Sequence, residues 1–365
     1  MDWREEKLQQ LDQLYEGMFD WLMKQYDPET GGFYYARSSV ENEDFTPDIE
    51  SSAQALNILI RHHLLDQMPN PIKGKMVQFF QSKQDVKTGY FYDPHPRMKE
   101  DEVMVHRALN YSLNSLKRLG ASNRYPLPLS LREAPAYTTS VEAYREKWES
   151  IDLRNSWRGC DLLASSTVYI REMPKETQRK FVDAFAAYLA GLQDRQTGLW
   201  GGEGSVYERI SGTFKLHTFY RSYQIPMPNK ERIYQSILRC LRQEEAIDMC
   251  YIRNPIDLLS YLALDIPEEE LKEITSITIE NMSRLKRADG AFSRELAHSP
   301  KAPNVAQVKE GDYYPNMPEP VQLGMGLVEG DMNATTQATL IRIQLHKLLG
   351  VDPKAIIANS EFWNN

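Results

Sequence analysis

The chain has 365 residues, 41% of them hydrophobic and 26% charged, so it can bury a core, and this composition excludes general disorder. The formal net charge of −8 offers no attraction to nucleic acid or to anionic lipid, and we expect neither as a partner. No apolar run reaches the roughly 20 residues of a membrane helix, and the polar beginning lacks the apolar segment of a signal peptide, so we predict a cytoplasmic protein without a membrane partner.

Six segments have the apolar spacing of helices with one polar face. In the first of them, Leu8, Leu11, Tyr15, Met18 and Leu22 follow one another by three and four residues, which places them on one stripe. A helix of this kind packs its stripe on a core and exposes its other face. We predict such outer helices over residues 5–25, 72–83, 140–150, 175–193, 230–243 and 268–286.

A second kind of helix follows each outer helix and is apolar on most of its surface. In the first example, Ile49, Ala53 and Leu56 form one stripe while Ile58 and Leu59 form another. Helices with so little polar surface belong inside a fold. We predict six of these inner helices, which begin near Asp48, Val103, Trp157, Thr213, Asn254 and Asn333.

A short motif separates outer from inner helices in four places. The glycine in it supplies the left-handed geometry that ends a helix, and the aromatic residue two positions later can fold back over the helix end. The intervals between the four glycines resemble one, two and two units of roughly 50 residues. The motifs are Gln25-Tyr-Asp-Pro-Glu-Thr-Gly31-Gly-Phe33, Gln84-Asp-Val-Lys-Thr-Gly89-Tyr-Phe91, Gln193-Asp-Arg-Gln-Thr-Gly198-Leu-Trp200 and the degenerate Arg287-Ala-Asp-Gly290-Ala-Phe292.

This alternation predicts an all-α fold, an (α/α)6 toroid of six helical hairpins whose inner helices form a barrel inside a sheath of outer helices. An open solenoid is the rival arrangement, but the inner helices lack the polar face that a concave groove needs. We expect one domain over residues 1–365. The long stretch 296–330, rich in Pro and Gly and containing Tyr313 and Tyr314, is expected to form an ordered flap.

The motifs between the helices of repeated hairpins resemble those of terpenoid cyclase and protein prenyltransferase toroids. They are also similar to the Thr-Gly-Leu-Trp turns of six-hairpin glycosidases and polysaccharide lyases with an (α/α)6 barrel. This resemblance covers nearly the whole chain as architecture, and it implies an active site at the end of the barrel where the inner helices begin.

In such a toroid the starts of all six inner helices meet around one cavity, and their polar and aromatic residues form one constellation. Hydrogen-bonding groups and rings suit a sugar better than a hydrocarbon chain. The catalytic candidates are Asp48, Glu50, Asp161, Asp257, Asp331, His106 and His217. The candidates for substrate binding are Arg107, Trp157, Arg158, Tyr220, Arg221, Tyr251, Arg253 and Asn333, with Tyr313 and Tyr314 from the flap.

Two carbohydrate chemistries fit these residues. Hydrolysis needs two carboxyl groups on either side of the scissile bond, whereas a lyase needs a His or Tyr base and an Arg that neutralises a uronate. We therefore expect a glycoside hydrolase or polysaccharide lyase acting on an oligosaccharide or smaller molecule, with acidic sugars favoured by the recurring arginines. We expect no cofactor and no metal site, because the three cysteines have no CxxC spacing and suit small buried positions.

Other interpretations stay open. Asp48, Asp331 and Asn333 stand where helix caps are expected, and each histidine has a packing role as its alternative. A terpenoid cyclase or prenyltransferase is a second hypothesis, although the Asp-x-Asp-Asp motif is absent and Asp248-Met-Cys250, which looks like half of a prenyltransferase zinc site, has no matching histidine one repeat later. A toroid that binds without catalysis is a third.

Overall fold

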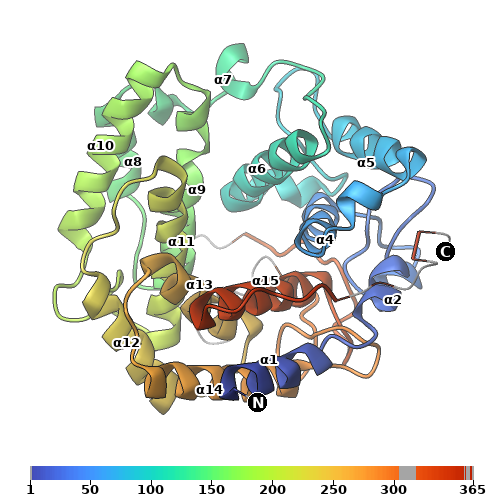
Figure 1. The fold of residues 1–365 in the computed structure, drawn as a ribbon. Helices are drawn as coiled ribbons and strands as arrows, with labels where there is room; N and C mark the ends of the chain where they lie inside the picture. Colours follow the sequence, from blue (N-terminus) through green and yellow to red (C-terminus); the bar gives the residue numbers. More distant parts are fainter. Residues whose placement is uncertain (1, 304–317, 357, 359–361, 364–365) are drawn as a thin grey trace. The chain divides into compact units, whose positions relative to one another are not determined.

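The computed structural model of the chain describes residues 2–303, 318–356, 358 and 362–363 (Figure 1). Within these residues, β-structure is limited to isolated bridges between helices' connecting segments, so the predicted all-α class is confirmed. No helix in the same residues is long and apolar enough to cross a bilayer. The described residues divide into two compact units: those within 1–82, 241–306 and 321–365 form unit 1, and those within 83–240 and 307–320 form unit 2.

Unit 1 is built on three neighbouring inner helices. In it, α15 (Met332–Leu349) packs against both α4 (Ile49–Arg61) and α13 (Met249–Leu262). The outer helices α1 (Trp3–Gln13) and α14 (Glu268–Leu285) contact each other and α15. Within the described residues, the remaining helical segments of unit 1 are α2 (Met18–Met23), α3 (Arg37–Val40), η1 (Leu65–Gln67) and α5 (Asn70–Ser82).

Unit 2 repeats this plan. Its inner helices are α6 (Glu102–Arg118), α9 (Ser156–Ser166) and α11 (Val206–Tyr223), with α9 packed against the other two. Its outer helices are α8 (Val141–Glu149), α10 (Lys175–Leu192) and most of α12 (Lys230–Gln243). The shorter segments are η2 (Pro96–Glu100), α7 (Pro128–Leu131), η3 (Ala136–Thr139) and η4 (Thr167–Glu172).

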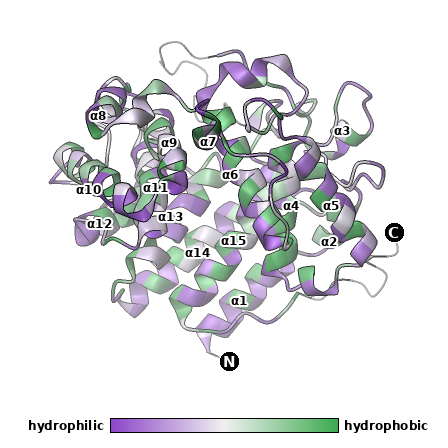
Figure 2. Cartoon of the chain, turned by 90° about the horizontal axis from the view of Figure 1, so that it is seen from above, coloured by the Kyte–Doolittle hydropathy of each residue, from purple (hydrophilic) through white to green (hydrophobic). Residues whose placement is uncertain are grey.

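The difference between inner and outer helices is as predicted. Nearly every residue of α13 is buried, whereas α14 buries only a stripe that runs from Ile274 to Leu285. Figure 2 shows the two-faced character of the outer helices α14 and α1, where hydrophilic and hydrophobic colours alternate along each helix. All three cysteines are buried, as expected, and none of them is part of a disulfide.

Three predicted boundaries are wrong. The first outer helix is broken, because Gly17 adopts a left-handed φ of 78° between α1 and α2. Helix α11 begins at Val206 and not near Thr213, since Ser205 and Glu208 form a reciprocal capping box that starts it seven residues earlier. Helix α13 begins at Met249 and not near Asn254, because the carboxylate of Asp248 caps it.

The predicted turns are confirmed. Gly31, Gly89, Gly198 and Gly290 have φ values of 81°, 75°, 71° and 101°, which glycine adopts without steric cost. After the third turn, the indole of Trp200 folds back and donates a hydrogen bond to the carbonyl of Leu189 near the end of α10, at 2.8 Å.

The glutamine of the motif has a role that the sequence does not reveal. The Gln84 side chain donates to the carbonyls of Gly89 and Tyr125, at 3.2 and 2.9 Å, and accepts from the backbone N–H groups of Arg124 and Tyr125, both at 2.9 Å. It therefore joins its own turn to a loop about 40 residues further along the chain.

Gly89→Ala will test the turn geometry. A methyl group there would have to adopt the left-handed conformation and would overlap the carbonyl oxygen of Pro126. We expect the free energy of unfolding in urea to fall by about 3 kcal/mol, the sum of strain and overlap. Gly120→Ala is the control, because Gly120 has the same φ of 75° and no atom within 4 Å of the added Cβ. It should lose only about 1 kcal/mol, and equal losses in the two variants would contradict the overlap.

Candidate functional site

Each of the six inner helices is preceded by a cap residue. Its side chain accepts a hydrogen bond from a backbone N–H group in the first turn of the helix. The caps are Asp48, Asp101, Asn155, Ser205, Asp248 and Asp331. The capping role considered for Asp48 and Asp331 is therefore observed. Asn333 is not the cap of α15 but lies in its first turn.

In unit 1 the starts of α4, α13 and α15 meet around Arg294. This guanidinium, only 3% exposed, donates to Asp248 Oδ1 and to Asn333 Oδ1, both at 2.7 Å. The backbone N–H of Arg294 donates to Asp331 Oδ2 at 2.6 Å, and Asn333 Nδ2 donates to Glu50 Oε1 at 3.4 Å. The structure thus brings the predicted residues Glu50, Asp331 and Asn333 together.

Burial governs the electrostatics of this cluster. Complete burial raises the pKa of Asp331 to about 6, although hydrogen bonds from Ser299 and from the backbone of Ala334 and Arg294 oppose the shift. The Ser299 hydroxyl donates to Asp331 Oδ2 at 2.7 Å. Both carboxylate oxygens of Asp331 accept hydrogen bonds from backbone or side-chain donors of unit 1. The observed role of Asp331 is therefore to connect the start of α15 to residues 294 and 299.

The other predicted residues of unit 1 lie on α13. Tyr251 is buried and Arg253 is half-buried, both in the first turns of the helix. Asp257 lies further along, 2% exposed, and its Oδ1 accepts a hydrogen bond from Gln344 Nε2 at 2.9 Å.

In unit 2 the structure joins several predicted residues in ion pairs. Arg158 Nη2 donates to Asp101 Oδ1 at 2.7 Å, and both side chains are 3% exposed. Asp161 Oδ2 lies 2.9 Å from Lys215 Nζ and 3.9 Å from Arg107 Nη1, so three inner helices contribute to this cluster. Trp157 is buried beside them on α9.

Three predicted residues do not lie where expected. His217, Tyr220 and Arg221 belong to the C-terminal half of α11, because that helix begins at Val206. His217 is fully buried, and its Nδ1 contacts the carbonyl of Phe214 in the preceding turn. The positions of Tyr313 and Tyr314 lie outside the described residues.

A cavity of about 290 Å³ lies in unit 2 at the starts of α6 and α9, beside the end of α8. We call it the Glu102 pocket. Seven of its lining residues are polar or charged and three are apolar. They are Glu100, Asp101, Glu102, Lys147, Ser150, Asp152 and Arg158, with Ile151, Leu162 and Pro318.

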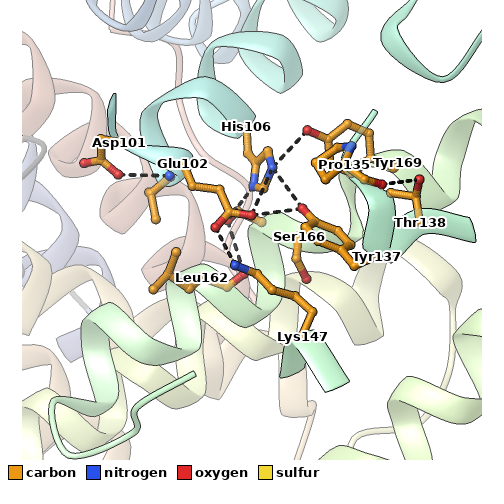
Figure 3. Close-up of polar contacts among 12 residues, drawn as sticks. Asp101, Glu102, His106, Pro135, Tyr137, Thr138, Lys147, Leu162, Ser166 and Tyr169 are labelled. Atoms are coloured by element: carbon orange, nitrogen blue, oxygen red, sulfur yellow. Dashed lines mark hydrogen bonds and ion pairs between the residues drawn. The ribbon is translucent and has the colours of Figure 1, made fainter. Parts of the chain in front are cut away.

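The Glu102 carboxylate is the best-organised group of this pocket (Figure 3). Its Oε2 lies 2.6 Å from Lys147 Nζ, its Oε1 accepts the hydroxyl of Tyr137 at 2.9 Å, and the side chain stays 32% exposed. Partial burial alone would raise its pKa, but His106 and the hydrogen bonds from Lys147 and Tyr137 outweigh burial, and the pKa of Glu102 lies below its usual value. The group is therefore an ionised carboxylate with acceptor capacity directed at a cavity.

His106 lies behind Glu102, on the next turn of α6. Burial lowers the pKa of His106 to about 4, so the ring is neutral at pH 7. Its Nε2 lies 3.1 Å from the hydroxyl of Tyr169 and 3.4 Å from that of Tyr137, and its Nδ1 lies 3.3 Å from Ser165 Oγ. Of the predicted catalytic residues, His106 is the one that contacts this pocket's carboxylate.

Sequence reasoning missed Glu102, Lys147 and Tyr137. Glu102 had a signal, since it directly precedes the predicted start of an inner helix, where site residues were sought. Lys147 lies on an outer helix and Tyr137 in a short connecting segment, neither of which the search covered. In the described residues, no three His, Cys, Asp or Glu side chains gather as ligands of a metal ion.

Comparison with protein families finds no match, and comparison with curated protein sequences finds none either. Two solved structures are similar over most of the chain. One is the GH76A α-1,6-mannanase from Salegentibacter sp., with 11% identity, 93% of this chain and 99% of that chain covered, and a TM-score of 0.44. The other is a protein from Actinoplanes, with 12% identity, coverage of 95% and 99%, and a TM-score of 0.45.

Proposed function

We propose that the chain is a carbohydrate-active enzyme that hydrolyses a glycosidic bond in the Glu102 pocket. The observation that carries this proposal is the Glu102 carboxylate, which is ionised, held by Lys147 and Tyr137, and exposed at a cavity of about 290 Å³. Mostly polar walls disfavour an isoprenoid chain, and carboxylates accept hydrogen bonds from sugar hydroxyls. The volume suits a single sugar unit better than a long stretch of polymer.

The proposed roles follow from the environments of the carboxyl groups. Glu102 acts as the base or nucleophile, because its pKa lies below the usual value. Glu100 is the second carboxyl group: it is exposed at the pocket and has no ion-pair partner among the described residues. Asp152 does not suit the role of acid, since the hydrogen bond from Arg154 holds the pKa of its carboxyl below the usual value.

The charges of the pocket favour a neutral sugar over the uronate considered from the sequence. Its walls carry the carboxylates of Glu100, Asp101, Glu102 and Asp152 against two cations, Lys147 and Arg158. Each cation already contacts a carboxylate, at 2.6 and 2.7 Å. A bound uronate would add negative charge to a site that is already negative.

A panel of matched oligosaccharides will test this proposal. We expect neutral oligosaccharides to raise the melting temperature and to release reducing ends, and their uronate counterparts to bind at least about 10-fold more weakly, a loss of about 1.4 kcal/mol. Dissociation constants from calorimetry at low and high salt provide the comparison, because the charge effect should shrink as salt rises. Tighter binding of the uronates would reverse the assignment, and cleavage of no glycan would remove the hydrolase proposal.

A further inference from the structure

The hydrogen bonds around His106 (Figure 3) all point in one direction, because the last group in their chain can only accept. That group is the carbonyl oxygen of Glu133, to which the Tyr90 hydroxyl gives its single hydrogen at 3.4 Å. In the 2.7 Å contact between Tyr90 and Tyr169, the Tyr169 hydroxyl is therefore the donor. With its hydrogen used there, the Tyr169 oxygen accepts from His106 Nε2, 3.1 Å away. These contacts place the hydrogen of the His106 ring on Nε2.

A second contact assigns the same hydrogen independently. The hydroxyl of Tyr137 donates to the Glu102 carboxylate, at 2.9 Å from Oε1. Its 3.4 Å contact with His106 Nε2 therefore also needs Nε2 as the donor. The other ring nitrogen, Nδ1, then carries a lone pair and faces the Ser165 hydroxyl, a group able to donate, at 3.3 Å.

The His106 ring is neutral, so it has only one hydrogen to place. Burial lowers the pKa of His106 to about 4. The charged groups that face the ring are the carboxylates of Glu102, Asp101 and Asp161 and the ammonium of Lys147. The three carboxylates only partly offset the effect of burial. At pH 7 the ring is therefore a neutral imidazole, in agreement with a single hydrogen on Nε2.

We propose that His106 is a positioning residue that holds Glu102 for the proposed hydrolysis through the hydroxyl of Tyr137. The Nε2 hydrogen occupies a lone pair of the Tyr137 oxygen and leaves the Tyr137 hydrogen directed at Glu102 Oε1. Lys147, which holds Oε2, lines the Glu102 pocket, whereas His106 and Tyr137 are not among its lining residues. His106 thus fixes the carboxylate from behind, without touching a substrate. The inference rests on the proposed function, in which Glu102 is the base or nucleophile.

The position of the ring hydrogen is measurable without a substrate. In protein with isotope-labelled histidine, proton–nitrogen correlation spectra at pH 7 distinguish a ring nitrogen that carries hydrogen from one that does not. We expect the first kind of signal from His106 Nε2 and the second from Nδ1. A wild-type ring with its hydrogen on Nδ1 would overturn the proposal.

The titration of Glu102 shows whether His106 acts on it. A donated hydrogen bond stabilises the ionised carboxylate, so its loss raises the pKa of Glu102. We expect His106→Leu, which has no donor, to raise the midpoint at which the Glu102 carboxyl carbon signal titrates. His106→Gln is the matched variant, because its amide N–H can take the place of Nε2–H, and its midpoint should stay near that of the wild type. His106→Asn, whose amide stops short of that place, replaces His106→Leu if the latter does not fold. Equal midpoints in the variants with and without the donor would also overturn the proposal.

Turnover provides the last readout. We expect His106→Leu to lower kcat about 10-fold, because a misplaced carboxylate reacts more slowly, and to leave KM nearly unchanged. His106→Gln should keep kcat within about 3-fold of the wild type, since the ring supplies a hydrogen bond and moves no proton. Equal kcat values for these two variants would refute positioning by His106. A shifted Glu102 titration in a protein that cleaves no glycan would instead refute the proposed function and leave the contact through Tyr137 standing.

Discussion

Replacing Arg294 by methionine will lower the free energy of unfolding by about 3–5 kcal/mol, the usual loss when one partner of a buried ion pair is removed. The guanidinium is 3% exposed and Asp248 is fully buried, so the substitution leaves a carboxylate without its cation in a place that water does not reach. It also removes the hydrogen bond to Asn333 on α15. Urea unfolding followed by circular dichroism measures the loss.

Arg284→Met is the matched control in the same unit. Arg284 pairs with Glu245, but its side chain is 39% exposed, so water replaces the lost contact and the change should stay within about 1 kcal/mol. The double variant Arg294→Met with Asp248→Asn should regain part of the loss, since it removes the stranded charge. Similar losses for Arg284 and Arg294, or a double variant less stable than the sum of its parts, would show that burial of the pair is not the cause.

Glu102→Gln will reduce kcat by about 10²–10⁴-fold, the contribution typical of a positioned acid or base. The amide keeps the size of the side chain and can still contact Tyr137, but it cannot take up a proton at neutral pH. Lys147 would lose its charged partner at 2.6 Å, a contact with one-quarter to one-third of each side chain exposed, so the loss of stability should be small. The rate is measured by product release from the neutral oligosaccharide that the panel identifies.

Glu149→Gln on α8 controls for the loss of a surface carboxylate near the same pocket. Glu149 is 52% exposed, pairs with Arg145 on its own helix, and is not one of the residues that line the pocket. We expect its kcat to equal that of the wild-type protein. A Glu102→Gln enzyme with normal kcat would move the chemistry to other residues, with the Asp161 cluster of unit 2 as the next set to test.

Apolar spacing predicted most of the helices, because which face of a helix is apolar depends only on residues close together in the sequence. The segments expected at 175–193 and 230–243 are observed as α10 and α12 with nearly the same ends. The predicted helix boundaries are wrong where a cap residue or a glycine, and not the apolar spacing, decides where a helix starts or breaks, as at Gly17 and Ser205. At Ser205 the sequence Ser-x-x-Glu is a capping signal that the prediction missed. The closure of all six hairpins into one ring, and the single-domain assignment, stay predictions.

The site was predictable to the extent that it depends on helix starts. Glu50 and Asn333 meet in unit 1, and Arg107 and Asp161 meet in unit 2, because neighbouring inner helices begin at the same level. Arg294 escaped prediction, since it lies in a connecting segment whose path is set by tertiary contacts. A cavity shared by both clusters also remains a prediction.

The hydrogen bonds of the Gln84 side-chain amide determine which mutations the loop at residues 124 and 125 can accept. It uses all of its hydrogen-bonding capacity on main-chain atoms, two carbonyls and two N–H groups, and on no other side chain. These four contacts therefore depend on the path of the backbone at residues 124 and 125, and not on which side chains those residues carry. Shortening that loop by even one residue would move its amide groups out of reach of Gln84, so we expect a deletion there to break all of the contacts between Gln84 and the loop at once.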